Sequence, residues 1–445
     1  MGRWHLLFFE VLSSLVAGGI AVTAYLKQQG VGNDKTKIER IAANTGLVTK
    51  DGKQIRIHRH TRGDGFTEYV FQIPLGLSFA DFEKKKHVFE DGLNIKRSTL
   101  DISLADLKTI NLHGNILEQI KSILANKKKL RKEIEMSFDG MLKIRVYERP
   151  LTDFLTFDET MLSRCNGWEI PIGVSRTEFV KHDFDTIPHM IVAGATQKGK
   201  SAFLKLLVTS LIALHPDDVR FTILDLKGGL VFAKFKDARQ VECVAKNVHE
   251  SIEALRAIRE EMNKRLEHFL DAGIEDVRAA GVKERHFVIV DEAAQIASAG
   301  ETDKEIKRLK IECEHILAEI ARVAGALGYR LIFCTQYATA DTLPRQVKQN
   351  ADAKLCFKLQ TEVASQVVLG EGETDAAHLP LIPGRAVYVT DRKQIVQCAY
   401  LTNDDINRLI GPHINIRPRK EEKNVEKSNQ EGTAPRSYSL VISET

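Results

Sequence analysis

Residues 189–201 read HMIVAGATQKGKS, and this stretch decides the fold. An apolar run leads into Gly194, four residues follow, and the tripeptide Gly199-Lys200-Ser201 then opens an amphipathic helical pattern. A buried strand that runs through G-x-x-x-x-G-K-S into a helix is the sequence signature of a phosphate-binding loop. We therefore predict a P-loop here, held between a strand and the helix that starts at Lys200.

The residue types in this loop suit the phosphates of ATP. Glycines let successive backbone N–H groups face the phosphates, and the N-terminus of the following helix adds positive potential. Lys200 is expected to bridge the β- and γ-phosphates, and the Ser201 hydroxyl to ligate magnesium, so ATP and Mg2+ are the predicted ligands. The alternative is an unrelated glycine-rich turn. The residues expected to bind the nucleotide are Gly194, Ala195, Thr196, Gln197, Lys198, Gly199, Lys200, Ser201 and Ala202.

A second motif lies downstream, where residues 287–292 read FVIVDE. Four apolar residues run into Asp291 and Glu292, so this acidic pair is expected at the C-terminal edge of a sheet strand. Asp291 is predicted to hold Mg2+ through water, and Glu292 to polarise the attacking water. Acidic residues commonly end strands, so the pair alone is weak evidence, but its position downstream of a P-loop makes it specific.

The chain beyond residue 165 alternates between apolar strands and helices. Strand patterns occur at 221–226, 287–290, 330–335 and 354–359, and helical patterns start at Lys200 and run through 252–269 and 306–323. Apolar strands separated by helices predict an α/β fold with a doubly wound parallel sheet. The strand RLIFCTQ ends in Gln336, which is predicted to sense the γ-phosphate; an ordinary strand end is the alternative.

The N-terminal segment 6–26, LLFFEVLSSLVAGGIAVTAYL, carries a single charge, Glu10. Its length is about that needed to cross a bilayer, roughly 20 residues. A cleaved signal peptide is the alternative. Basic residues are more numerous after the segment than before it, which places the rest of the chain on the cytoplasmic side of the membrane. We therefore predict a single-pass protein of the bacterial cell membrane with its C-terminal part in the cytoplasm.

The remaining patterns suggest the domain organisation. Strand-like alternation at 55–60 and 67–74 gives way to helical patterns at 78–93 and 116–134 and to a strand at 142–147. Lysines 127–129 and 132 read either as contacts to DNA phosphates or as a solvated helix face. The predicted parts are an N-terminal tip (1–5), a transmembrane helix (6–26), a linker (27–50), a small α+β domain (51–150), a motor domain (165–412) and a disordered charged tail (413–445).

Bulk composition bounds the function only loosely. The chain has 445 residues, with 64 Lys and Arg against 60 Asp and Glu, so its net charge of +4 does not by itself indicate nucleic-acid binding. The six cysteines form no CxxC pair, which argues against a zinc site or a disulfide framework. His58 and His60 flank Arg59, and we interpret them as a solvated strand face rather than as metal ligands.

The order of five segments resembles the FtsK/SpoIIIE family of DNA translocases over about residues 170–400. These segments are IPHMIVAGATQKGKS, TILDLKGG, FVIVDEAAQI, EIARVAGALGYRLIFCTQ and LPRQVKQNADAKLCFKL. A membrane anchor, a small domain and a motor together resemble the conjugative coupling proteins of Gram-positive mobile elements. The resemblance implies a RecA-like P-loop ATPase domain, a homo-hexameric ring that binds DNA without sequence specificity in its channel, and partners such as a relaxase and other conjugation-machinery proteins.

The resemblance also assigns roles to residues. Lys200 and Ser201 match the Walker A residues, Asp291 and Glu292 the Walker B pair, and Gln336 the sensor glutamine. The proposed catalytic set is therefore Lys200, Glu292 and Gln336, and the metal set is Ser201 and Asp291. The short D-x-K element is matched by Asp225 and Lys227.

Some positions depart from the family pattern. Gln197 and Lys198 stand where glycine and serine are usual, and we expect neither position to require glycine. Gly325 stands where an arginine often occurs, which leaves Arg322 and Arg345 as candidates for a trans-acting arginine finger, each with a plain surface arginine as the alternative. Two other functions share these motifs: a secretion ATPase that moves proteins, and a membrane platform that recruits partners under nucleotide control.

Overall fold

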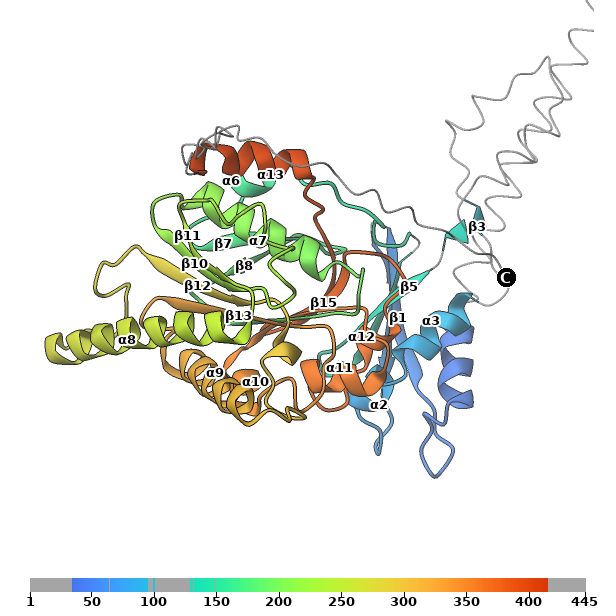
Figure 1. The fold of residues 1–445 in the computed structure, drawn as a ribbon. Coiled ribbons are helices and arrows are strands. Elements are labelled where there is room, and N and C mark those ends of the chain that lie inside the picture. Colours follow the sequence, from blue (N-terminus) through green and yellow to red (C-terminus); the bar gives the residue numbers. More distant parts are fainter. Residues whose placement is uncertain are drawn as a thin grey trace, which may run out of the picture.

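The computed structural model describes residues 34–63, 65–94, 99–100, 129–130, 132–147 and 149–414. Figure 1 shows a small domain built on an antiparallel sheet beside a larger α/β domain. The predicted tip and transmembrane segment, residues 1–26, lie outside the described residues, as does almost all of the predicted tail. Within the described part of the chain, no helix has the length and apolar character that a membrane span requires.

The small domain contains a four-stranded antiparallel sheet in the order β1-β2-β6-β5. The strands predicted at 55–60, 67–74 and 142–147 are confirmed, while the helical pattern at 78–93 forms two helices instead of one. The strands are β1 (Arg56–Arg62), β2 (Phe66–Gln72), β5 (Glu133–Phe138) and β6 (Leu142–Tyr147), and the helices are α2 (Phe79–Glu83) and α3 (Lys86–Asn94).

One predicted helix can be compared with the structure only at its end, and the predicted linker is partly helical. Most of the helix predicted at 116–134 lies outside the described residues; of its described positions, Lys129–Leu130 form strand β4, and Glu133 and Ile134 begin strand β5, which pairs with β6 and buries Ile134 in the core. The described part of the predicted linker 27–50 contains a helix over residues 34–44. Ile38 and Ala42 lie four residues apart on one face of that helix and pack into the small domain's core.

The large domain has a ten-stranded sheet in the order β11-β10-β12-β13-β9-β14-β15-β16-β7-β8. Six neighbouring strands are parallel, and four further strands extend the sheet in antiparallel fashion. The parallel strands are β9 (Met190–Ala193), β10 (Val219–Leu224), β11 (Val241–Ala245), β12 (Arg285–Val290), β13 (Tyr329–Thr335) and β14 (Ala353–Phe357). The antiparallel strands are β7 (Glu169–Val174), β8 (Phe179–Asp183), β15 (Arg385–Val389) and β16 (Lys393–Cys398).

The prediction of a parallel sheet is therefore correct for the nucleotide-binding half and wrong for the other half. Short connections join β7 to β8 and β15 to β16, and a chain that turns back so soon pairs antiparallel. The result is a mostly parallel α/β sheet of the RecA-like P-loop type.

Helices cover both faces of the sheet (Figure 1). Each face of the large sheet has its own hydrophobic core. On one face α7 (Lys200–Leu214), α13 (Asn403–Ile410) and the short α6 (Thr160–Ser163) pack on the first of these cores. On the other face α8 (Val248–Ala272), α9 (Lys304–Val323), α10 (Arg345–Asn350), α11 (Glu362–Leu369) and α12 (Asp375–His378) pack on the second. All six residues of β12 are buried, as expected of a strand covered on both sides.

Ion pairs and ring stacking join the small domain to the large one. Lys393 on β16 contacts Glu83 of α2 at 2.7 Å, and also Glu373 at 2.6 Å. The rings of His87 on α3 and His378 on α12 stack with their centroids 4.2 Å apart. The small domain therefore lies against strands β15 and β16, next to the site described below.

Candidate nucleotide-binding site

The P-loop connects the end of β9 to the start of α7, where the sequence predicts it. Its first and last glycines have no room for a side chain. A Cβ on Gly194 would lie 2.6 Å from the Phe357 Cβ, and one on Gly199 would lie 2.9 Å from the Gly384 nitrogen. Gly199 also has a φ of +123°. Glycine is therefore required at both positions by close approach of β14 and of the turn before β15.

Gln197 corrects one expectation. We expected no conformational need for glycine at this position, yet Gln197 has a φ of +62° and is the single non-glycine residue with positive φ in the described part of the chain. A left-handed conformation costs an L-residue roughly 1–2 kcal/mol, which is why glycine is favoured there. The loop thus holds Gln197 in a strained conformation, as functional sites often do.

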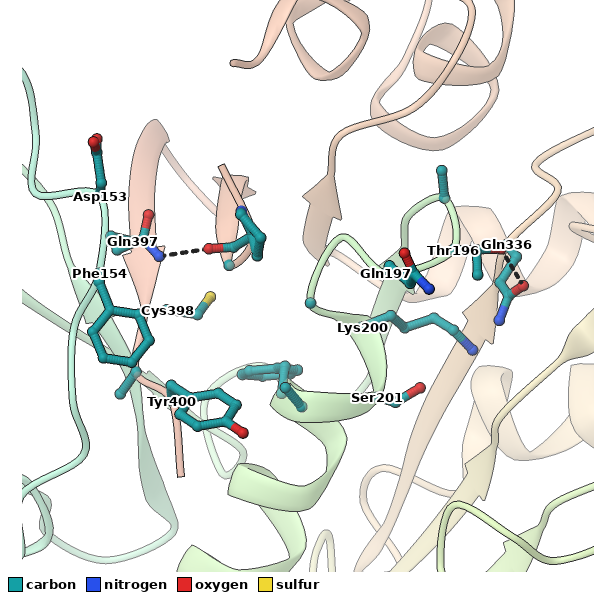
Figure 2. Close-up of a pocket in the computed structure, with 17 residues that line it drawn as sticks. Asp153, Phe154, Thr196, Gln197, Lys200, Ser201, Gln336, Gln397, Cys398 and Tyr400 are labelled. Atoms are coloured by element: carbon teal, nitrogen blue, oxygen red, sulfur yellow. Dashed lines mark hydrogen bonds between the residues drawn. The ribbon is translucent and has the colours of Figure 1, made fainter. Parts of the chain in front are cut away.

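Lys200 forms an ion pair with Asp291. Its Nζ donates to Asp291 Oδ1 at 2.9 Å and to the Asp291 backbone oxygen, and both side chains are almost completely buried. Within the described residues Asp291 Oδ2 is buried without a hydrogen-bond partner. A buried carboxylate oxygen rarely lacks a partner, and it is a ligand type that Mg2+ prefers. The Ser201 hydroxyl lines the same cavity as Lys200, so the predicted metal set fits Mg2+ (Figure 2).

Glu292 lies at the meeting point of three neighbouring strands. It is 2% exposed, and its Oε2 accepts from Lys227 Nζ at 3.0 Å. Its Oε1 accepts from the Gln336 backbone N–H at 3.1 Å and from Thr335 Oγ1 at 3.3 Å. Since β10, β12 and β13 are parallel, their C-terminal ends bring these three segments to one edge of the sheet.

Gln336 joins this cluster to the P-loop. Its Oε1 accepts a hydrogen bond from Thr196 Oγ1 at 3.3 Å, drawn as a dashed line in Figure 2. This hydrogen bond couples a movement of the loop at Thr196 directly to the end of β13. This position suits the sensor role that the sequence predicts for Gln336.

The two residues of the D-x-K element, Asp225 and Lys227, have different roles. Asp225 is fully buried, and its Oδ2 accepts from the backbone N–H groups of Val231 at 3.0 Å and Phe232 at 3.4 Å, so it shapes the loop after β10. Lys227 instead reaches Glu292. The structure therefore brings only Lys227 into contact with the predicted catalytic residues.

The two candidate arginines lie away from the cavity of their own chain. Arg322 is exposed in the last turn of α9, before β13 begins, whereas Arg345 is exposed at the start of α10, after β13 has ended. Gln336 immediately follows β13 at the sheet edge that carries the site, and Arg345 follows Gln336 in the sequence. Neither arginine lines the cavity, and the assignment of a finger stays a prediction.

The cavity beside the P-loop has a volume of about 390 Å3, within the range typical of small-molecule sites. Figure 2 shows two walls. One carries the P-loop and the start of α7, from Ala195 to Phe203. The other comes from distant segments of the chain, and its residues are Asp153, Phe154, Pro383, Gly384, Gln397, Cys398, Ala399 and Tyr400.

Sequence reasoning missed this second wall. The only local signal is the Pro383-Gly384 dipeptide, which predicts a turn. The Gly384 N–H donates to the Lys198 backbone oxygen at 2.9 Å, so this turn supports the P-loop directly. Burial raises the pKa of Cys398, so its thiol presents a protonated, weakly polar group to the cavity.

The fold and this site define a P-loop ATPase domain. Residues 167–289 match the family model of the FtsK/SpoIIIE family, so this part of the chain is similar to that family's domain. The DNA translocase FtsK of Chlorobaculum tepidum is 25% identical over 267 residues, which cover 55% of this chain and 32% of that protein. The DNA translocase FtsK of Streptococcus pneumoniae is 23% identical over 367 residues, 76% of this chain and 45% of that protein. The chain thus spans less than half the length of these relatives.

Solved structures share the fold. The pCW3 conjugation coupling protein TcpA, in a monomer form with ATPgS, matches with a TM-score of 0.56 at 18% identity and covers 85% of this chain and 99% of that chain. EssC (ATPases 2 and 3) from Geobacillus thermodenitrificans matches with a TM-score of 0.50 at 16% identity, covering 59% and 52%. Both are similar in fold.

Proposed function

We propose that this chain hydrolyses ATP and uses the energy to move DNA. The observation that carries the ATPase assignment is the meeting of Lys200, Asp291, Glu292 and Gln336 at one edge of the sheet, beside a cavity that the P-loop lines. Lys200 is close enough to exchange Asp291 for phosphate oxygens. The carboxylate released from Lys200, with Ser201, would then hold Mg2+, which supplies charge neutralisation on the phosphates.

The hydrolytic step is assigned to Glu292. Its carboxylate is buried and oriented by Lys227 and by the Gln336 N–H, so it is held in one position at the site edge. A carboxylate held in this way orients a water molecule and accepts its proton as the water attacks the γ-phosphorus. Gln336, bonded to Thr196 of the P-loop, would report loss of the γ-phosphate to the rest of the domain.

The DNA assignment rests on the relatives. Those that match over the motor are named DNA translocases, and the structural neighbour that covers both of this chain's domains is named a conjugation coupling protein. The proposal therefore includes a homo-hexameric ring with DNA in its channel, a role in conjugative transfer with a relaxase among its partners, and an anchor in the cell membrane at residues 6–26 that keeps the motor in the cytoplasm.

The test is the ATPase rate of the full-length protein in detergent, with and without single- and double-stranded DNA. We expect DNA to raise the rate and Lys200→Ala to abolish it. Turnover that a secreted polypeptide stimulates and DNA does not would establish protein secretion instead. ATP binding with no turnover under any condition would favour a recruiting platform.

A further inference from the structure

Two aromatic side chains stand at the end of the cavity remote from Gln336. Phe154 and Tyr400 are 59% and 47% exposed, and both line the cavity. Their ring centroids are 5.7 Å apart and their planes are inclined by 44°. In Figure 2 they lie across the cavity from Thr196 and Gln336, with the P-loop and α7 between. Exposed apolar groups that line a cavity beside a phosphate-binding loop are in a position to contact a bound ligand.

Hydrogen bonds hold the backbone around these two rings, whereas the ring faces are partly exposed to solvent. We call residues 151–157 the strap. Its C-terminal half pairs with the chain after β16, since the Tyr400 N–H donates to the Leu155 oxygen at 2.8 Å and the Phe157 N–H donates to the Tyr400 oxygen at 2.9 Å. Its N-terminal half is held by Arg385, which donates to the backbone oxygens of residues 151 and 152 at 3.0 and 2.7 Å. Both rings are thus presented from a fixed scaffold.

We propose that Phe154 and Tyr400 form the subsite for the base of the nucleoside triphosphate whose phosphates the P-loop binds. This inference rests on the proposed ATPase function and extends it to a part of the ligand that the P-loop does not touch. A nucleobase presents a flat π face, and aromatic side chains bind it by stacking. The cavity is also lined by small residues, Ala202, Gly384 and Ala399, which leave room for the sugar.

The polar groups near the rings explain what this subsite selects. Both ends of the Gln397 amide are held by the protein, because its Oε1 accepts from Arg385 Nε at 3.0 Å and its Nε2 donates to the Pro383 oxygen at 2.9 Å. The Asp153 carboxylate lies 3.8 Å from the Arg385 guanidinium, so it is already engaged within the protein. Recognition therefore depends on ring size, so ATP and GTP bind with affinities within a few-fold and both bind more tightly than CTP or UTP.

The experiment measures binding of ATPγS and of inorganic tripolyphosphate to the full-length protein by calorimetry. We expect Phe154→Ala and Tyr400→Ala each to weaken ATPγS binding about tenfold, within the range for loss of one base-stacking contact. Tripolyphosphate has no base, so its affinity is expected to stay the same. Phe154→Trp and Tyr400→Phe keep the stacking surface and should bind ATPγS normally.

Phe138→Ala is the matched control, since Phe138 is 49% exposed but belongs to the small domain. The inference is overturned if the Phe154→Ala/Tyr400→Ala double variant binds ATPγS like the wild type, or if it loses tripolyphosphate to the same extent. In those outcomes the ATPase proposal stands, because the wild type still binds ATPγS. A wild type that binds neither ligand overturns both.

Discussion

Arg385→Met is expected to destabilise the protein and to weaken nucleotide binding together. Arg385 is 1% exposed and lies on β15, next to Gly384 of the cavity wall. Its guanidinium donates to the strap at Leu151 and Thr152 and to Gln397. Methionine fills much of the same space without any donor, so the substitution removes hydrogen bonds while keeping most of the packing.

The magnitude follows from the acceptors left behind. Leu151 and Gln397 are buried, so two acceptors lose their donor in a place that water does not reach, whereas Thr152 is exposed and its carbonyl becomes hydrated. Each buried unsatisfied acceptor costs about 1–3 kcal/mol, so we expect the two together to lower the free energy of unfolding by about 2–6 kcal/mol. Since the strap carries Phe154, ATPγS affinity should fall about tenfold, as for loss of that ring.

The assay is urea unfolding followed by circular dichroism, with ATPγS calorimetry on the same samples. Arg392→Met is the control, because Arg392 follows β15 but is 61% exposed and pairs with Glu178 at the surface. Such exposed pairs contribute at most about 1 kcal/mol. If Arg385→Met changed the unfolding free energy by no more than the control, and ATPγS affinity were unaltered, the role assigned to Arg385 would be refuted.

Three further predictions concern the P-loop, the catalytic edge and the core. Glu292→Gln should keep ATPγS affinity within a few-fold and lower the ATPase rate by about 100-fold or more, since it removes the proton acceptor; a rate near that of the wild type would exclude Glu292 as the base. Gln197→Gly relieves a left-handed residue, so its unfolding free energy should equal or exceed the wild-type value by up to about 1 kcal/mol, and a clear loss of stability would contradict the strain seen there. Burial opposes ionisation of Asp185, but hydrogen bonds from Arg285 and Arg330 outweigh it and hold the pKa of Asp185 below its usual value. The stability that Asp185 contributes is therefore full above about pH 4 and is lost as pH falls through the lowered pKa, so the stability difference between wild type and Asp185→Asn should shrink in acid; a difference independent of pH would show that the charge of Asp185 is not involved.

The parts of the site that could be predicted are short sequence motifs whose residues act together and lie next to one another in the chain. The P-loop and the FVIVDE strand are short motifs in which each residue's role follows from its neighbours, and parallel strands then place the ends of β9, β12 and β13 at one edge. The pairing of Lys227 with Glu292 follows from that edge only after the strand order is known. The left-handed Gln197 is a backbone conformation that a glutamine in sequence does not reveal.

The second wall of the cavity was beyond sequence reasoning for a different reason. Phe154 and Tyr400 are separated by most of the motor domain's sequence, and no local pattern predicts that the strap pairs with the chain after β16. The end of the helix predicted at 116–134 differs from the structure for another reason. Glu133 and Ile134 follow a run of lysines that favours a helix, but hairpin pairing of β5 with β6 places these two residues in a strand.

The measurement that tests the central claim most directly is displacement of streptavidin from biotinylated ends of single- and double-stranded DNA by the full-length protein. A motor that moves along DNA strips streptavidin only when it hydrolyses ATP. We predict displacement with ATP, none with ATPγS, and none for Lys200→Ala or Glu292→Gln. ATP hydrolysis that DNA does not stimulate, with streptavidin left in place on every substrate, would contradict the account.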